Sequence, residues 1–209
     1  MGDYYEDPVL LIKCAWGGRS LFHNFLPPSA ATYPTPEKDG DKGFQYAETI
    51  RITREVTSKL KEYYPAYTGS GYEIIGFGWH QGWNDRIDQN AVDAYEENLV
   101  HLIKDLRKDL GVKDLPFVIA NSGFDGWEIN PRYREKVLKH INAQLAVADA
   151  EKYPAFKGNV AAVETRDFFR PSEASPSKQG FHWSRNWETF YLIGQHMGQA
   201  MLELVSNSR

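Results

Sequence analysis

The sequence predicts an α/β fold, a three-layer α/β/α sandwich around a mostly parallel sheet. Two observations indicate this class. Short apolar runs alternate along the chain with amphipathic stretches, and the apolar runs are nearly continuous. Continuous apolar runs are typical of strands buried on both faces of a sheet. Strand–helix alternation requires right-handed crossovers, which place helices on both faces of a parallel sheet.

Four apolar runs are predicted as strands, at residues 9–16, 73–79, 116–120 and 160–164. Amphipathic stretches predict helices at about 44–63, 92–106, 131–150 and 187–205. Pro131 suits a first helical turn, and Asn186 suits the N-cap of the last helix. No linker or internal repeat divides the 209 residues, so we expect one domain over residues 1–209.

The segment 23–43 contains four prolines and has no hydrophobic periodicity. A loop of this length after the carboxyl end of a strand is either functional or disordered. Ligands of open parallel sheets bind at those carboxyl ends. We therefore expect the segment to form one wall of the site.

The composition excludes several classes of partner. The net charge is −4 and the basic residues form no stripe, which excludes a nucleic-acid surface. No run of 18 apolar residues occurs, so no membrane span is expected. Cys14 is the single cysteine, which excludes an internal disulfide. The acidic start is unlike a signal peptide, but the compartment stays open. Aromatic residues reach 14%, which suits a sugar-binding cleft and equally the filling of a core.

Three polar clusters follow predicted strands or precede the last helix: 16–20 (Trp-Gly-Gly-Arg-Ser), 79–85 (Trp-His-Gln-Gly-Trp-Asn-Asp) and 180–183 (Gly-Phe-His-Trp). A parallel sheet would bring them to one rim. Each has a purely structural alternative. The glycine pair could be a tight turn, the polar groups of 79–85 could cap the next helix, and His182 could be an ordinary loop histidine. The mixture of tryptophans and polar groups directly after a buried strand favours a functional site.

These motifs resemble those of sialate O-acetylesterase and related carbohydrate acetylesterases, a branch of the SGNH (GDSL-like) hydrolases. The matching pieces are the strand that runs into Gly17-Gly18, the W-x-Q-G-x-x-D motif at 79–85, and the closing segments 181–183, 187–194 and 197–201. The similarity covers nearly the whole chain in the family's order. The W-x-Q-G-x-x-D piece is its most specific part.

The resemblance implies a serine esterase that removes acetyl groups from carbohydrates without a cofactor or a metal. A serine in an upstream G-Q-S-N segment would attack the acetyl carbonyl, and His182 would accept its proton. The Gly18 N–H and the Gln81 amide would hold the oxyanion. Asn84 is the rival of Gln81, because 82–85 also spells the superfamily's G-x-N-D block. The substrate would contact the remaining rim residues, namely Trp16, Gly17, Arg19, Ser20, Trp79 and Trp83.

Three departures from the family pattern affect the assignment. No G-Q-S-N occurs, and neither Ser20 nor Ser122 stands in its place. Gln179 occupies the position, three residues before the histidine, where relatives often have Asp. Trp83 follows Gln-Gly where some relatives have Glu. The acid that orients the imidazole is therefore open, with Asp85 or a main-chain carbonyl as candidates.

The resemblance also implies a structural gap. In the family's sheet order, 2-1-3-4-5, the absent first strand separates the run at 9–16 from that at 73–79. The gap could be completed by another segment or chain, closed by the two strands themselves, or filled by a second copy through swapping.

Two other functions remain open. One is a non-catalytic sugar-binding remnant of the fold. The other is a metal hydrolase using His80, Asp85, Asp88 or His182, which no ligand spacing supports.

Overall fold

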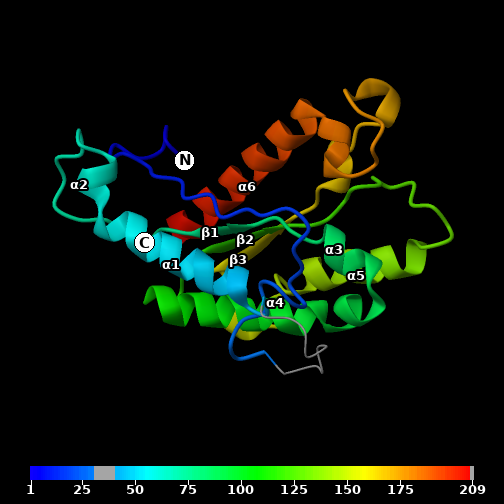
Figure 1. Cartoon of the computed structure of the whole chain (residues 1–209), viewed down its shortest axis with the longest axis horizontal. Coiled ribbons are helices and arrows are strands. Elements are labelled where there is room, and N and C mark those ends of the chain that lie inside the picture. Colours follow the sequence, from blue (N-terminus) through cyan, green and yellow to red (C-terminus); the bar gives the residue numbers. More distant parts are fainter. Residues whose placement is uncertain (31–40, 208–209) are drawn as a thin grey trace.

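A computed structural model describes residues 1–30 and 41–207, and within them it has one parallel sheet with helices on both faces (Figure 1). The strands are β1 (Phe77–Trp79), β2 (Phe117–Ala120) and β3 (Val160–Val163), in the order β1-β2-β3. Phe77 pairs with Phe117, which pairs in turn with Val160. The predicted α/β class with a parallel sheet is confirmed.

Six α-helices occur in the described ranges: α1 (Phe44–Ser58), α2 (Leu60–Tyr63), α3 (Trp83–Ile87), α4 (Gln89–Leu110), α5 (Arg134–Ala146) and α6 (Trp187–Asn207). The Asn186 Oδ1 accepts a hydrogen bond from the Thr189 N–H at 3.1 Å, which confirms the predicted cap of α6. The helix expected from Pro131 begins later, at Arg134. Among the described residues, no helix combines the length and apolarity that a membrane crossing requires.

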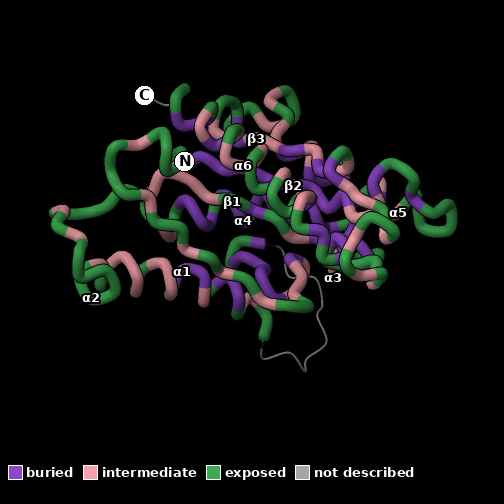
Figure 2. Tube along the Cα trace, turned by 90° about the horizontal axis from the view of Figure 1, so that it is seen from above, coloured by how far each residue is buried: buried purple, intermediate pink, exposed green. Residues whose placement is uncertain are grey.

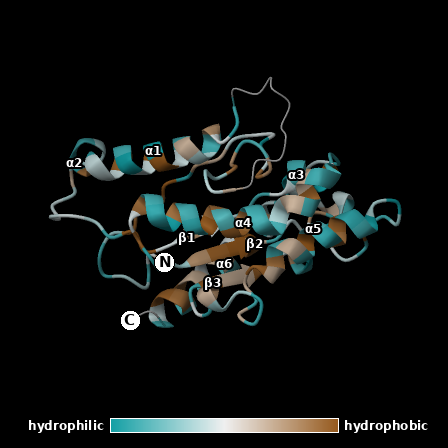
Figure 3. Cartoon of the chain, turned by 90° about the horizontal axis from the view of Figure 1, so that it is seen from below, coloured by the Kyte–Doolittle hydropathy of each residue, from teal (hydrophilic) through white to brown (hydrophobic). Residues whose placement is uncertain are grey.

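The side chains of β2 separate the two halves of the core. Phe117 and Ile119 belong to the cluster that packs against α4 and α5, while Val118 and Ala120 pack against α6. All four are fully buried. Figure 2 shows the buried chain concentrated in the sheet and its flanking helices, and Figure 3 shows β2 among the hydrophobic segments. Burial on both faces explains why the run is continuously apolar.

The prediction of a strand at 9–16 is wrong. Among the described residues the segment has no strand pairing, and Leu11 is 80% exposed. The strand expected at 73–79 is shortened to β1, whose one partner in that part of the chain is β2. A strand is stable only where a neighbouring strand pairs with it through ladder hydrogen bonds. In the expected sheet one further strand lies between 9–16 and 73–79, and no strand of the described residues fills that place. The two runs therefore have not closed up on each other.

We predict a sharp contrast in hydrogen exchange between these segments. The amides of 10–15 should exchange rapidly because no backbone acceptor protects them, whereas those of Phe117–Ala120 should be among the slowest. Amide exchange followed by NMR would measure both. Protection of 10–15 equal to that of β2 would contradict the unpaired arrangement.

Candidate functional site

The loops that follow the carboxyl ends of the strands gather on one side of the molecule, at the right in Figure 1. Gly18 adopts φ 68°, a left-handed conformation that favours glycine. A Cβ placed on Gly18 would lie 3.9 Å from Asn84 Nδ2. The glycine turn and the loop after β1 are therefore in direct proximity, as expected for the carboxyl ends of a parallel sheet.

The side chain of Gln81 connects three segments. Its Nε2 donates to the Arg19 carbonyl at 2.9 Å and to Asp85 Oδ2 at 2.5 Å, so both of its N–H groups are engaged. Its Oε1 accepts a hydrogen bond from the Tyr95 hydroxyl at 3.0 Å. Gln81 therefore fastens the turn at Arg19 to the loop after β1 and to α4.

The backbone carbonyl of Gln81 is fixed as well. It accepts hydrogen bonds from the Ser122 Oγ at 3.1 Å and the Gln144 Nε2 at 2.8 Å, and it shares the Tyr95 hydroxyl proton, at 3.1 Å, with Oε1 of the same residue. Tyr95, Ser122 and Gln144 are each at most 1% exposed. These buried polar residues come from α4, the end of β2 and α5, and their convergence places the loop after β1 in one position.

Asp85 is fully buried beneath this loop. Its carboxylate accepts hydrogen bonds from the backbone N–H groups of Leu21 and Phe22, both at 2.9 Å, besides the bond from Gln81. Burial raises the pKa of Asp85 to about 6, against the opposing effect of the hydrogen bonds that it accepts. Within the described residues its partners do not include His182. The geometry makes Asp85 a tie between the segment 20–22 and the loop after β1.

Gly82 lies where no other residue fits. Its φ is 156°, and a Cβ would come within 1.9 Å of Ser122 Oγ and 2.5 Å of His140 Nε2. His140 is fully buried, and neither ring nitrogen has a hydrogen-bond partner among the described residues. Burial, and to a lesser extent the charge of Arg86, lower the pKa of His140 to about 3.

An aromatic cluster joins the loop after β1 to the segment that carries His182. Phe124 lies 5.2 Å from Trp83 and 4.9 Å from Trp183, measured between ring centroids. His80 stacks on Trp183 at 6.2 Å, and Phe181 contacts Trp83 at 6.0 Å. The third polar cluster of the sequence thus lies beside the second, through packing of the residues on either side of His182.

His182 itself is exposed and contacts the ring of Phe181 at 5.1 Å. In the described part of the chain its imidazole makes no hydrogen bond. The segment His182–Arg185 has positive φ at every residue, between 49° and 60°. This conformation costs about 1–2 kcal/mol for each residue that is not glycine. Burial of Trp183 and Ser184 offsets that cost and fixes the backbone at His182.

The residues expected to contact substrate differ in accessibility. Trp79 is only 5% exposed and donates its indole N–H to the Tyr95 hydroxyl, so it is a core residue and its assignment to the substrate surface is wrong. Trp16 is partly buried against Phe25. The other four lie nearer the solvent. Gly17 is exposed, and Arg19 pairs with Asp41 at 3.5 Å. The Ser20 hydroxyl accepts a hydrogen bond from the His23 N–H, and Trp83 lies under the Arg86 guanidinium at 4.3 Å.

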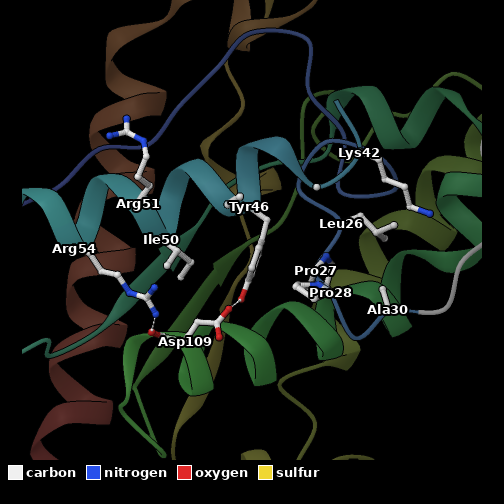
Figure 4. A pocket seen from close by; sticks show the side chains of 12 residues that line it. Leu26, Pro27, Pro28, Ala30, Lys42, Tyr46, Ile50, Arg51, Arg54 and Asp109 are labelled. Atoms are coloured by element: carbon white, nitrogen blue, oxygen red, sulfur yellow. Dashed lines mark hydrogen bonds between the residues drawn. The ribbon is translucent and has the colours of Figure 1, made fainter. Parts of the chain in front are cut away.

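A pocket of about 680 Å³ lies apart from these residues, between the segment Leu26–Ala30, α1 and the end of α4 (Figure 4). Across it, Asp109 accepts hydrogen bonds from the Tyr46 hydroxyl and from the Arg54 guanidinium, both at 2.6 Å. Its lining includes no predicted site residue. The described ends of the loop 23–43 thus border this pocket, and residues 31–40 of the expected wall lie outside the described residues.

The family model described as "Carbohydrate esterase, sialic acid-specific acetylesterase" matches residues 3–173. The chain belongs to this family. It is 25% identical over 150 residues to the "Probable carbohydrate esterase At4g34215" of Arabidopsis thaliana, covering 72% of this chain and 47% of that protein. The X-ray structure of the Arabidopsis thaliana protein AT4G34215 matches the fold with a TM-score of 0.58 and 23% identity, over 90% of this chain and 58% of the other. The chain thus spans about half the length of these relatives.

Sequence reasoning missed the buried residues that hold the site. Tyr95 appears in the apolar stripe of its helix, and nothing in the pattern distinguishes its hydroxyl as a ligand of Gln81. Gln144 and His140 lie in a helical stretch where polar residues are usually exposed. The one available signal is the spacing, because His140 and Gln144 are four residues apart and therefore share a helix face.

We predict that His140 makes the protein sensitive to acid. Its folded-state pKa of about 3 lies below the reference value of 6.5. The contribution of neutral His140 to the free energy of unfolding is therefore complete above about pH 6.5. It is lost as the pH falls, by about 1.4 kcal/mol per pH unit down to about pH 3. His140→Leu should remove this dependence, so that the wild type loses about 2 kcal/mol more than the variant between about pH 6.5 and pH 5 in urea denaturation.

The raised pKa of Asp85 acts in the opposite direction between about pH 4 and pH 6, but it is present in both proteins and cancels in the comparison. Val137→Ala, a buried change on the same helix, is the matched control and should destabilise equally at both pH values. Identical pH dependence in wild type and His140→Leu would contradict the assignment.

Proposed function

We propose that the domain hydrolyses acetyl esters of carbohydrates, with His182 as the general base and an oxyanion site formed by the Gly18 N–H and the Asn84 side-chain amide. The observation that carries the proposal is the proximity of Asn84 Nδ2 to the Gly18 turn. In the described part of the chain the Asn84 side chain makes no hydrogen bond, and it is partly exposed. A backbone N–H and a side-chain amide this close together suit the stabilisation of a developing negative charge.

Asn84 is better placed than Gln81 for this role. Gln81 would have to break its bond to the Arg19 carbonyl or to the buried Asp85 before it could donate to a ligand. Breaking the second bond would leave the carboxylate with one donor fewer in a buried place, which costs about 1–3 kcal/mol. Gln81 is therefore proposed as the residue that positions the turn, and Asn84 as the donor.

The proposed reaction follows the usual course of a serine esterase. A hydroxyl attacks the acetyl carbonyl while His182 accepts the hydroxyl proton. The two amide donors stabilise the tetrahedral oxyanion, which collapses as His182 returns the proton to the departing sugar oxygen. Water then attacks the acyl group in the same way, which releases acetate and regenerates the hydroxyl.

The attacking hydroxyl is proposed to come from an extended segment that pairs with the free edge of β1. Ser122 is 1% exposed and bonded to the Gln81 carbonyl, and the Ser20 hydroxyl accepts the His23 N–H, so neither fits the role. Among the described residues, one edge of β1 and the segment 9–16 have no strand partner, so both offer backbone groups to an additional strand. A second copy of the chain is the other source of such a strand.

Hydrolysis of p-nitrophenyl acetate and of an acetylated oligosaccharide tests the proposal, with the chain assayed alone and together with the proposed serine-bearing segment. His182→Ala should abolish turnover. Asn84→Ala should lower kcat about 100- to 1,000-fold with an unchanged melting temperature. Gln81→Ala should lower both activity and melting temperature, because three segments lose their common partner.

Asn90→Ala is the matched control, since Asn90 is an exposed amide at the start of α4. It should leave activity unchanged. Full activity in His182→Ala would refute the esterase assignment. Full activity in Asn84→Ala together with a folded but inactive Gln81→Ala would transfer the donor role to Gln81.

A second candidate function, non-catalytic sugar binding, is favoured by the surroundings of His182. Gln179 replaces the family's Asp, and its Nε2 donates to the Phe181 carbonyl rather than contacting the imidazole. A histidine without an orienting acid is a weaker base. Binding of an acetylated glycan without its hydrolysis, with the serine-bearing segment present, would favour this reading.

A further inference from the structure

We propose that Trp127 is a stacking platform for a neutral sugar ring, forming a subsite for the glycan chain on the rim that carries the esterase residues. This inference rests on the proposed function only in its choice of ligand, a carbohydrate. Trp127 lies in the loop between β2 and α5, and Asp167 and Arg166 lie in the turn after β3. Both loops leave carboxyl ends of neighbouring strands, where ligands of parallel sheets bind.

The indole of Trp127 is exposed and yet held in one orientation. It is 59% exposed, its Nε1–H donates to Asp167 Oδ1 at 2.8 Å, and the Arg166 guanidinium covers the ring at 3.8 Å from its centroid. An exposed tryptophan ordinarily keeps its rotamer freedom. Here that freedom is already lost in the free protein, which lowers the entropic cost of stacking a ligand on the remaining face.

The guanidinium over the ring is itself anchored in the interior. Arg166 donates to both carboxylate oxygens of Glu164, at 2.9 and 2.6 Å, and its side chain is only 11% exposed. Glu164 also accepts from the Nδ2 of the fully buried Asn121 at 2.8 Å. Hydrogen bonds therefore connect the end of β2 to the Arg166 guanidinium, and its cation–π contact connects the guanidinium to the exposed indole.

Two glycines allow the loops to approach closely enough for this contact. A Cβ on Gly123 would lie 2.7 Å from the Arg166 nitrogen, and one on Gly126 would lie 2.8 Å from the ring of Phe169. Gly126 also has φ 58°. The loop that presents Trp127 is thus fitted tightly to the loop after β3. Packing accounts for the rigidity of this structure but not for an indole left facing solvent.

The surroundings of Trp127 match a sugar better than a protein partner. On its loop between β2 and α5, the other exposed large apolar side chain is Tyr133, so the described residues of this loop form no broad apolar patch by themselves. A single aromatic face beside a carboxylate, here that of Asp167, suits the C–H face and the hydroxyl groups of a pyranose. The Arg166 charge is balanced by Glu164, and Asp167 and Glu128 are both exposed. This acidic rim disfavours a sugar that carries a carboxylate.

Titration calorimetry of the chain with xylotriose, cellotriose and N-acetylneuraminic acid tests the subsite without requiring hydrolysis. Wild type should bind a neutral trisaccharide more tightly than N-acetylneuraminic acid. Trp127→Ala should weaken the neutral ligand about tenfold or more, and Trp127→Phe should retain part of the affinity. Trp187→Ala is the matched control, since Trp187 is an exposed indole on α6 and should not affect binding.

A structural role alone would lower the melting temperature of Trp127→Ala and leave the affinity of the folded protein unchanged, and this result would overturn the proposal. Failure of wild type to bind either neutral trisaccharide, or equal losses in Trp127→Ala and Trp187→Ala, would overturn it as well. Binding that depends on Trp127 in a protein without esterase activity would support the subsite and refute only the proposed hydrolysis.

Discussion

The arrangement of the rim depends on the hydrogen bonds that converge on Gln81. Its carbonyl and its side-chain amide together engage residues from the glycine turn, α3, α4, the end of β2 and α5. These partners are mostly buried, where an unsatisfied polar group is costly. Because these hydrogen bonds satisfy polar groups that are mostly buried, they favour one conformation of the loop after β1, which brings Asn84 close to Gly18.

The same constraint explains why glycine is required at position 82. The donors that reach the Gln81 carbonyl must pass within contact distance of the next residue, and Ser122 Oγ and His140 Nε2 occupy the space that a Cβ would need. The Q-G pair of the sequence motif is therefore one structural unit. The glutamine provides the hydrogen-bonding centre, and the glycine leaves room for the groups that surround it.

The hydrophobic pattern was sufficient to predict the layers and the helices, but it did not predict where the sheet ends. The runs at 116–120 and 160–164 became β2 and β3 because each has a strand neighbour within the chain. The equally apolar run at 9–16 did not, since strand formation depends on a pairing partner that composition does not reveal. The apolar pattern reports the side chains' tendency to be buried, whereas the backbone hydrogen bonds decide whether a run becomes a strand.

Candidate site residues were predictable to the extent that they follow predicted strand ends in the chain. Gly18, Gln81 and Asn84 were proposed in this way, because parallel topology brings such residues to one rim. The left-handed turn at His182–Arg185 has no sequence signal, since none of its residues is a glycine. Its conformation is maintained by the packing of Trp183 against His80 and Phe124. Long-range packing therefore sets the backbone that carries the histidine, and a change in either ring would alter its position without touching the imidazole.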